Sequence, residues 1–182
     1  MAPTASLRSR ALTELLYLDA AKPSGTPALE SVGDNGEWRA RRLRGHAARL
    51  RKIAGEHLEL AAESAAAGDL LLAQRQRDLA ERASCHYMAY DELAMAAERR
   101  GRARRFVRGS TVWEIEVCLA LAAIRRAEGH RERGEVVLHR GDTSASARHR
   151  HFAEEAEETA RIAELRAAEL LEAQAGASQG VP

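Results

Sequence analysis

Small aliphatic side chains recur every three or four residues through most of this sequence, and this spacing is the strongest constraint on its fold. Steps of three and four place residues on one face of an α-helix. Aromatic residues make up only 4% of the chain, so we expect a helical core built mainly from Ala and Leu. The clearest stripe consists of Leu43, Ala47, Leu50, Ala54, His57 and Ala61.

The pattern predicts an all-α fold of four long antiparallel helices, arranged as a bundle or as coiled-coil-like hairpins, plus a short N-terminal helix. Gly68 and Asp69 suit the left-handed end of one helix and the N-cap of the next. So short a turn makes the flanking helices antiparallel neighbours. We expect a short helix and linker over 1–37, a helical domain over 38–174 and a flexible tail over 175–182.

Within the helical domain, the expected helices follow the apolar stripes and the helix-start signals. Thr111 and Glu114 match a capping box at the start of the third helix. Gly129 or Gly134 should end that helix, and we interpret 136–138 as loop. The expected helices are 38–67, 70–100, 111 to 129 or 134, and 147–174; their stripes include Gln76 as a polar exception and the larger side chains Leu72, Leu79, Val117, Phe152 and Leu171.

The charges are balanced over the whole chain but unevenly distributed. The formal net charge is +1, which gives no general reason to expect a nucleic-acid partner. Residues 1–110, however, hold 19 basic and 14 acidic side chains, whereas residues 111–182 hold 9 and 13. The first and second expected helices carry arginine runs without any acid, and the fourth is rich in glutamate. The basic and acidic helices could pack together, or the runs could be solvated.

The arginine runs are the candidate functional residues. Both fall near the same end of the hairpin that closes at Gly68, and several arginines together bind phosphate groups. No aromatic-rich strand or helix-turn-helix accompanies them. The candidate polyanion-binding residues are Arg39, Arg41, Arg42, Arg44, Arg99, Arg100, Arg102, Arg104, Arg105 and Arg108.

No catalytic constellation or cofactor motif is recognisable. A ferritin-like di-metal site needs two Glu-x-x-His motifs, and the sequence contains none; His151 with Glu154 and Glu155 is the nearest substitute. His57 and His86 lie on apolar stripes, where a hydrogen-bonded core histidine is commoner than a ligand. Cys85 and Cys118 are too far apart along their helices for a disulfide. We therefore expect no metal, no cofactor and no identifiable small-molecule substrate.

The sequence favours a non-catalytic binding or scaffolding protein that associates with itself or with a protein partner. Its Ala-rich helices bury little area each, which leaves apolar surface for such a contact. The alternatives are a nucleic-acid-binding accessory protein, such as one of a mobile element, and a metal-binding helical bundle. With two cysteines, no secretory signal and no membrane-spanning segment, the expected location is the cytoplasm.

Overall fold

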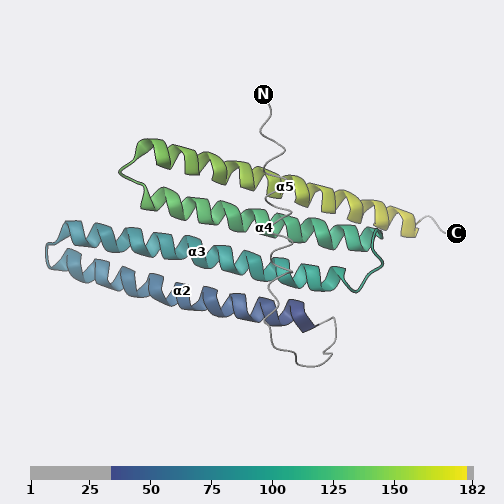
Figure 1. Ribbon diagram of the computed structural model, residues 1–182, viewed down its shortest axis with the longest axis horizontal. Coiled ribbons are helices and arrows are strands. Elements are labelled where there is room, and N and C mark those ends of the chain that lie inside the picture. Colours follow the sequence, from purple (N-terminus) through teal and green to yellow (C-terminus); the bar gives the residue numbers. More distant parts are fainter. Residues whose placement is uncertain (1–33, 180–182) are drawn as a thin grey trace, which may run out of the picture. The chain divides into compact units, whose positions relative to one another are not determined.

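The computed structural model describes residues 34–179, which form four α-helices and no β-strand in that range. The helices are α2 (Asp34–Ala66), α3 (Leu70–Ala103), α4 (Thr111–Leu138) and α5 (Thr143–Gln179). The prediction of an all-α fold with four long antiparallel helices is confirmed (Figure 1). The expected N-terminal helix and residues 180–182 lie outside the described residues.

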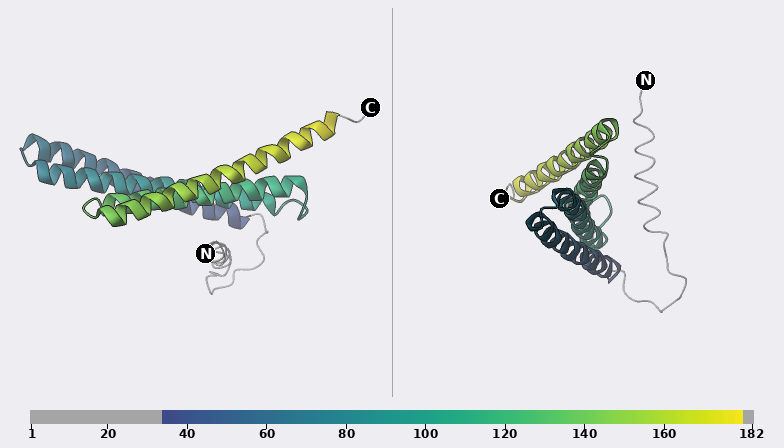
Figure 2. Two further views of the ribbon diagram at one scale, coloured as in Figure 1. Left: turned by 90° about the horizontal axis from the view of Figure 1, so that it is seen from above. Right: turned by 90° about the vertical axis from the view of Figure 1, so that its left-hand side faces the viewer.

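The four helices lie side by side in chain order (Figure 1). α3 packs against α2 and α4, and α4 packs against α3 and α5; among the described residues, no other pair of helices is in contact. The right-hand view of Figure 2 shows the same order from a further direction, with α2 and α5 at the edges. The bundle is therefore open, since the two edge helices do not meet.

Alanine occupies the lines of contact between neighbouring helices. On α2 the buried residues are spaced seven apart, at Ala40, Ala47, Ala54 and Ala61, which is the repeat of helices that cross at a shallow angle. Ala40 packs against Ala94 and Ala97 of α3. Across the α4–α5 contact, Ala122 packs in the same way against Ala160 and Ala163.

Leucine is missing from the fully buried positions of the described chain, but Leu43 and Leu121 are partly buried and pack against the two alanine clusters. The expected Ala and Leu core is therefore right for alanine, whereas leucine borders the core. Apart from alanine, the buried apolar residues are Cys85, Ile115 and Val137. Where the helices approach most closely, there is room for a methyl group but not for a leucine side chain. An open row has no second layer to cover its faces, so several predicted core residues are exposed instead: Leu72, Leu79, Val117, Phe152 and Leu171.

Two glycines that were expected to end the third helix lie inside α4. A Cβ on Gly129 would lie 3.4 Å from the carbonyl oxygen of Ala153, and one on Gly134 would lie 3.4 Å from Cβ of Cys85. Both glycines therefore allow α4 to approach its two neighbours closely. Packing outweighs their low helix propensity, and 136–138 is helical rather than loop.

The outer boundaries of the helical region also differ from the prediction. α2 begins at Asp34 rather than Trp38, because Gly36 packs against the end of α3. A Cβ on Gly36 would lie 3.0 Å from the carbonyl oxygen of Ala97 and 3.0 Å from Cα of Gly101. At the other end, α5 continues to Gln179 instead of ending at Gln174.

The turns follow local capping chemistry. Gly68 has φ of +82°, and the Asp69 side chain accepts a hydrogen bond from the Leu72 amide at 2.9 Å, as predicted. The capping box at Thr111 is wrong by one residue: Ser110 is extended and its hydroxyl accepts from the Trp113 amide at 3.3 Å. The expected loop before the last helix is shorter, because Asp142 caps α5 by accepting from two backbone amides.

Candidate polyanion-binding surface

The structure brings the two arginine runs to one end of the α2–α3 hairpin, as their spacing predicts. Gly36 at the start of α2 lies against Gly101 near the end of α3. Arg105 then reaches back to Glu37, with 3.3 Å between Nη2 and Oε1. The ten predicted arginines therefore share one end of this hairpin and the connection that leads to α4; we call them the basic end.

Several of these arginines form ion pairs with nearby glutamates. Arg44 lies 2.7 Å from Glu98, and Arg99 and Arg102 both approach Oε2 of Glu116, at 3.3 and 3.5 Å. The Glu116 side chain is only 13% exposed, so its two cations compensate a largely desolvated carboxylate. These three arginines are engaged in ion pairs between helices, which limits their availability to a ligand.

Other members of the basic end face solvent. Arg41 and Arg108 are exposed and form no ion pair within residues 34–179. The guanidinium of Arg42 lies over the ring of Trp38, 5.6 Å from its centroid, and Arg104 and Arg105 are also exposed. Arg39 and Arg100 are half-buried. The basic end therefore combines structural arginines with exposed ones that can contact phosphate groups.

The acidic fourth helix does not neutralise the basic end within one chain. α5 contacts α4 but neither α2 nor α3. Its glutamates pair instead with α4 or with α5 itself: Glu157 with Arg133, Glu164 with Arg126, and Glu158 with Arg161. The explanation that the basic and acidic helices pack together is therefore wrong for a single molecule.

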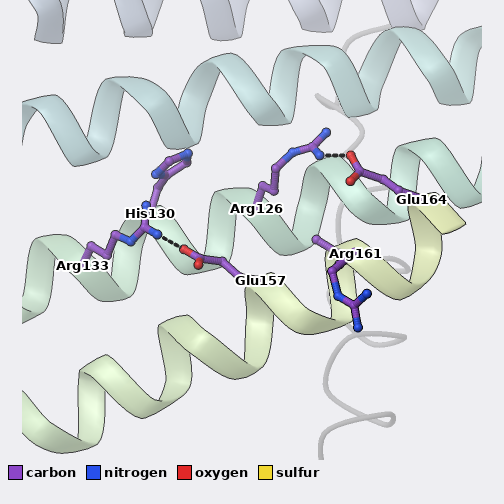
Figure 3. Close-up of a pocket in the computed structure, with 7 residues that line it drawn as sticks. Arg126, His130, Arg133, Glu157, Arg161 and Glu164 are labelled. Carbon is purple, nitrogen blue, oxygen red and sulfur yellow. Dashed lines mark hydrogen bonds and ion pairs between the residues drawn. The ribbon is translucent and has the colours of Figure 1, made fainter.

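A shallow cavity of about 310 Å³ lies between α4 and α5, and its charges are already paired (Figure 3). Arg126 bridges three helices, since it pairs with Glu92 of α3 at 3.1 Å and with Glu164 of α5. Arg133 pairs with Glu157, and the Arg161 side chain points away from the Arg126–Glu164 pair (Figure 3). Because its cations are neutralised by these glutamates, this cavity offers little net charge to an anionic ligand.

The histidines are dispersed among separate contacts. Nδ1 of His57 lies 2.7 Å from Oε1 of Gln76, which explains the polar exception in the second stripe. His149 pairs with Glu132 at 2.7 Å, while His151, Glu154 and Glu155 are exposed. No group of three possible metal ligands occurs among the described residues. Sequence spacing located His57 on the helix contact but did not identify its partner.

Two partly buried histidines should make the free energy of unfolding depend on pH. Burial lowers the pKa of His86 and of His130 from the ordinary 6.5, and Arg82 and Arg133 respectively lower it further. As the pH falls, these histidines therefore become protonated at a higher pH in the unfolded chain than in the folded protein. The free energy of unfolding should consequently decrease as the pH falls through 6.5. We expect a lower urea midpoint at pH 5 than at pH 7. The loss should shrink in a His86→Gln/His130→Gln variant, and an equal loss would contradict the assignment.

The two cysteines are unpaired thiols. Cys85 is buried and Cys118 is half-buried, and burial raises the pKa of both thiols above the ordinary value. A raised pKa keeps a thiol protonated and poorly nucleophilic at neutral pH. Cys85, which lies against Gly134 of α4, therefore acts as a small apolar group in a helix contact.

Among the described residues, no helix combines the length and the apolar character needed to cross a membrane. Comparison with known proteins gives no family assignment: no protein-family model, no curated protein and no solved structure matches this chain.

Proposed function

We propose that this protein is a non-catalytic helical scaffold that associates with other copies of itself. The observation that carries the proposal is the exposure of large apolar side chains in the described region. Seventeen of them are exposed, including Leu70 at 71%, Leu71 at 69% and Trp38 at 56%. Single exposed apolar residues are ordinary on a monomer, but a set this large favours an interaction surface.

The open row explains why these side chains remain outside. Helix contacts made of alanine bury little area, and the larger residues lie beside those contacts with no second layer above them. At the α2–α3 turn, Leu58, Leu60, Leu70 and Leu71 are all exposed. A second molecule would supply the missing apolar neighbours.

The proposed location is the cytoplasm, and it is supported by the two unpaired thiols.

Light scattering at several protein concentrations tests the proposal. We expect a mass above 19.9 kDa that falls on dilution, because association follows mass action. A Leu70→Ser/Leu71→Ser variant should associate more weakly, by about 10-fold or more, since it removes two exposed apolar side chains. Leu138→Ser, at an exposed position on α4, is the control. A constant mass of 19.9 kDa at high concentration would rule out self-association.

A second candidate function is the binding of a polyanion such as a nucleic acid at the basic end. The observation that favours it is the gathering of ten arginines around few carboxylates, with Arg41 and Arg108 free of ion pairs within the described residues. Phosphate contacts of this kind give affinity without base specificity.

A further inference from the structure

The outer face of α2 carries four exposed charged residues in a self-complementary order. Arg42, Arg49, Glu56 and Glu63 are each seven residues apart, and all four are exposed. Seven residues are close to two helical turns, so the four side chains form one row along the helix. The row has two positive charges followed by two negative ones; we call it the charged row.

We propose that two copies of this chain pair through the outer faces of α2, antiparallel and related by a two-fold axis. This inference rests on the proposed self-association. In that arrangement Arg42 lies opposite Glu63 of the second copy, and Arg49 lies opposite Glu56. Both pairs form in a single register, because the arginines and the glutamates have the same spacing. The two-fold axis repeats them, so the dimer contains four such ion pairs.

Gly45 lies on the same face and permits a close approach of the two helices. A Cβ added to Gly45 or to Gly55 would meet nothing within 4 Å, so no contact in the described chain explains a glycine at either position. In the register set by the charged row, Gly45 lies opposite Leu60 of the second copy, so the absent side chain leaves room for this exposed leucine. Gly55 lies about 100° around the helix from Glu56, outside this line of contact.

The same register also covers exposed apolar side chains at both ends of the contact. Trp38 lies near one end of the outer face of α2. In this register it is opposite the α2–α3 turn of the second copy. That turn is followed by Leu70 and Leu71, the two most exposed leucines of the described chain. α2 has 33 residues, about 50 Å of helix, so the contact runs from one Trp38 to the other.

Charge reversal tests this arrangement in the full-length chain. Glu56→Arg/Glu63→Arg makes the charged row entirely positive, and Arg42→Glu/Arg49→Glu makes it entirely negative. Each variant alone should repel itself and raise the dimer dissociation constant at least 100-fold. An equimolar mixture of the two should restore a dimer, since opposite rows then face each other. Sedimentation equilibrium gives the masses, and circular dichroism confirms that each variant is folded.

The matched control changes the same number of charges elsewhere. Glu155 and Glu172 of α5 are exposed and form no ion pair in the described residues, so Glu155→Arg/Glu172→Arg should leave the dimer intact. A monomeric wild-type chain would contradict the proposed function as a whole. A wild-type oligomer that neither reversal weakens, or that the mixture fails to restore, would contradict only this interface.

Pairing of α2 with α5 of another copy is the main competing arrangement, and the same variants exclude or reveal it. A contact between the arginines of α2 and the glutamates of α5 would be weakened by Arg42→Glu/Arg49→Glu but not by Glu56→Arg/Glu63→Arg. Such a head-to-tail contact also continues into rings or filaments. Weakening by the arginine reversal alone, or the formation of rings or filaments, would overturn the two-fold dimer.

Discussion

Replacing Ala122 by leucine should destabilise the protein by about 3 kcal/mol, near the upper end of the usual cost of overpacking. Ala122 is fully buried and packs against Ala160 and Ala163 of α5. A leucine there adds three carbon atoms at the line where α4 and α5 approach each other. The helices would have to move apart, which would also lengthen the ion pairs along their edges.

Urea denaturation at one fixed protein concentration measures this effect, because self-association makes apparent stability depend on concentration. Ala168→Leu is the matched control: the chemical change is the same, but Ala168 is exposed on α5 and its replacement should change stability by less than about 0.5 kcal/mol. Equal midpoints for Ala122→Leu and wild type would show that the α4–α5 contact is not closely packed.

Removing exposed arginines from the connection between α3 and α4 should weaken polyanion binding by on the order of 100-fold at 0.1 M salt, if that surface contacts phosphate groups. The variant is Arg104→Gln/Arg105→Gln/Arg108→Gln. It spares Arg99 and Arg102, which compensate the largely desolvated Glu116. Each lost phosphate contact should also reduce the slope of log affinity against log salt concentration by about one.

Fluorescence anisotropy with a labelled oligonucleotide at several salt concentrations provides both quantities. The control variant, Arg131→Gln/Arg148→Gln/Arg150→Gln, removes three exposed arginines of α4 and α5 and the same total charge. Equal losses in the two variants would show that net charge, rather than the basic end, governs binding. Salt-insensitive binding, or none at low salt, would remove the second candidate function.

The fold was predictable as far as local periodicity determines it. The spacing of small residues indicated four long helices, and Gly68 with Asp69 indicated the first turn, because both signals act within a few residues. The fates of Gly36, Gly129 and Gly134 depend on distant backbone that approaches them. A propensity scale treats such a glycine as a helix breaker, whereas the structure uses it at a helix contact.

The same limit applies to the candidate site. Counting residues from the turn at Gly68 placed both arginine runs at one end of a hairpin, and the structure agrees. The sequence could not show that Glu116 pairs with Arg99 and Arg102, since that contact depends on how α4 returns along α3. Nor could it show that α2 and α5 remain apart, because a closed bundle and an open row share the same helix pattern.

Because each helix packs only against the helices next to it in the sequence, the described region resists local opening unevenly. α3 and α4 each have two packed neighbours, whereas α2 and α5 each have one. Detaching an edge helix therefore breaks one line of contacts, while releasing a central helix breaks two, so the isolated chain should loosen from its edges inward. Pairing through α2 would secure one of these edges and leave α5 as the first helix to detach.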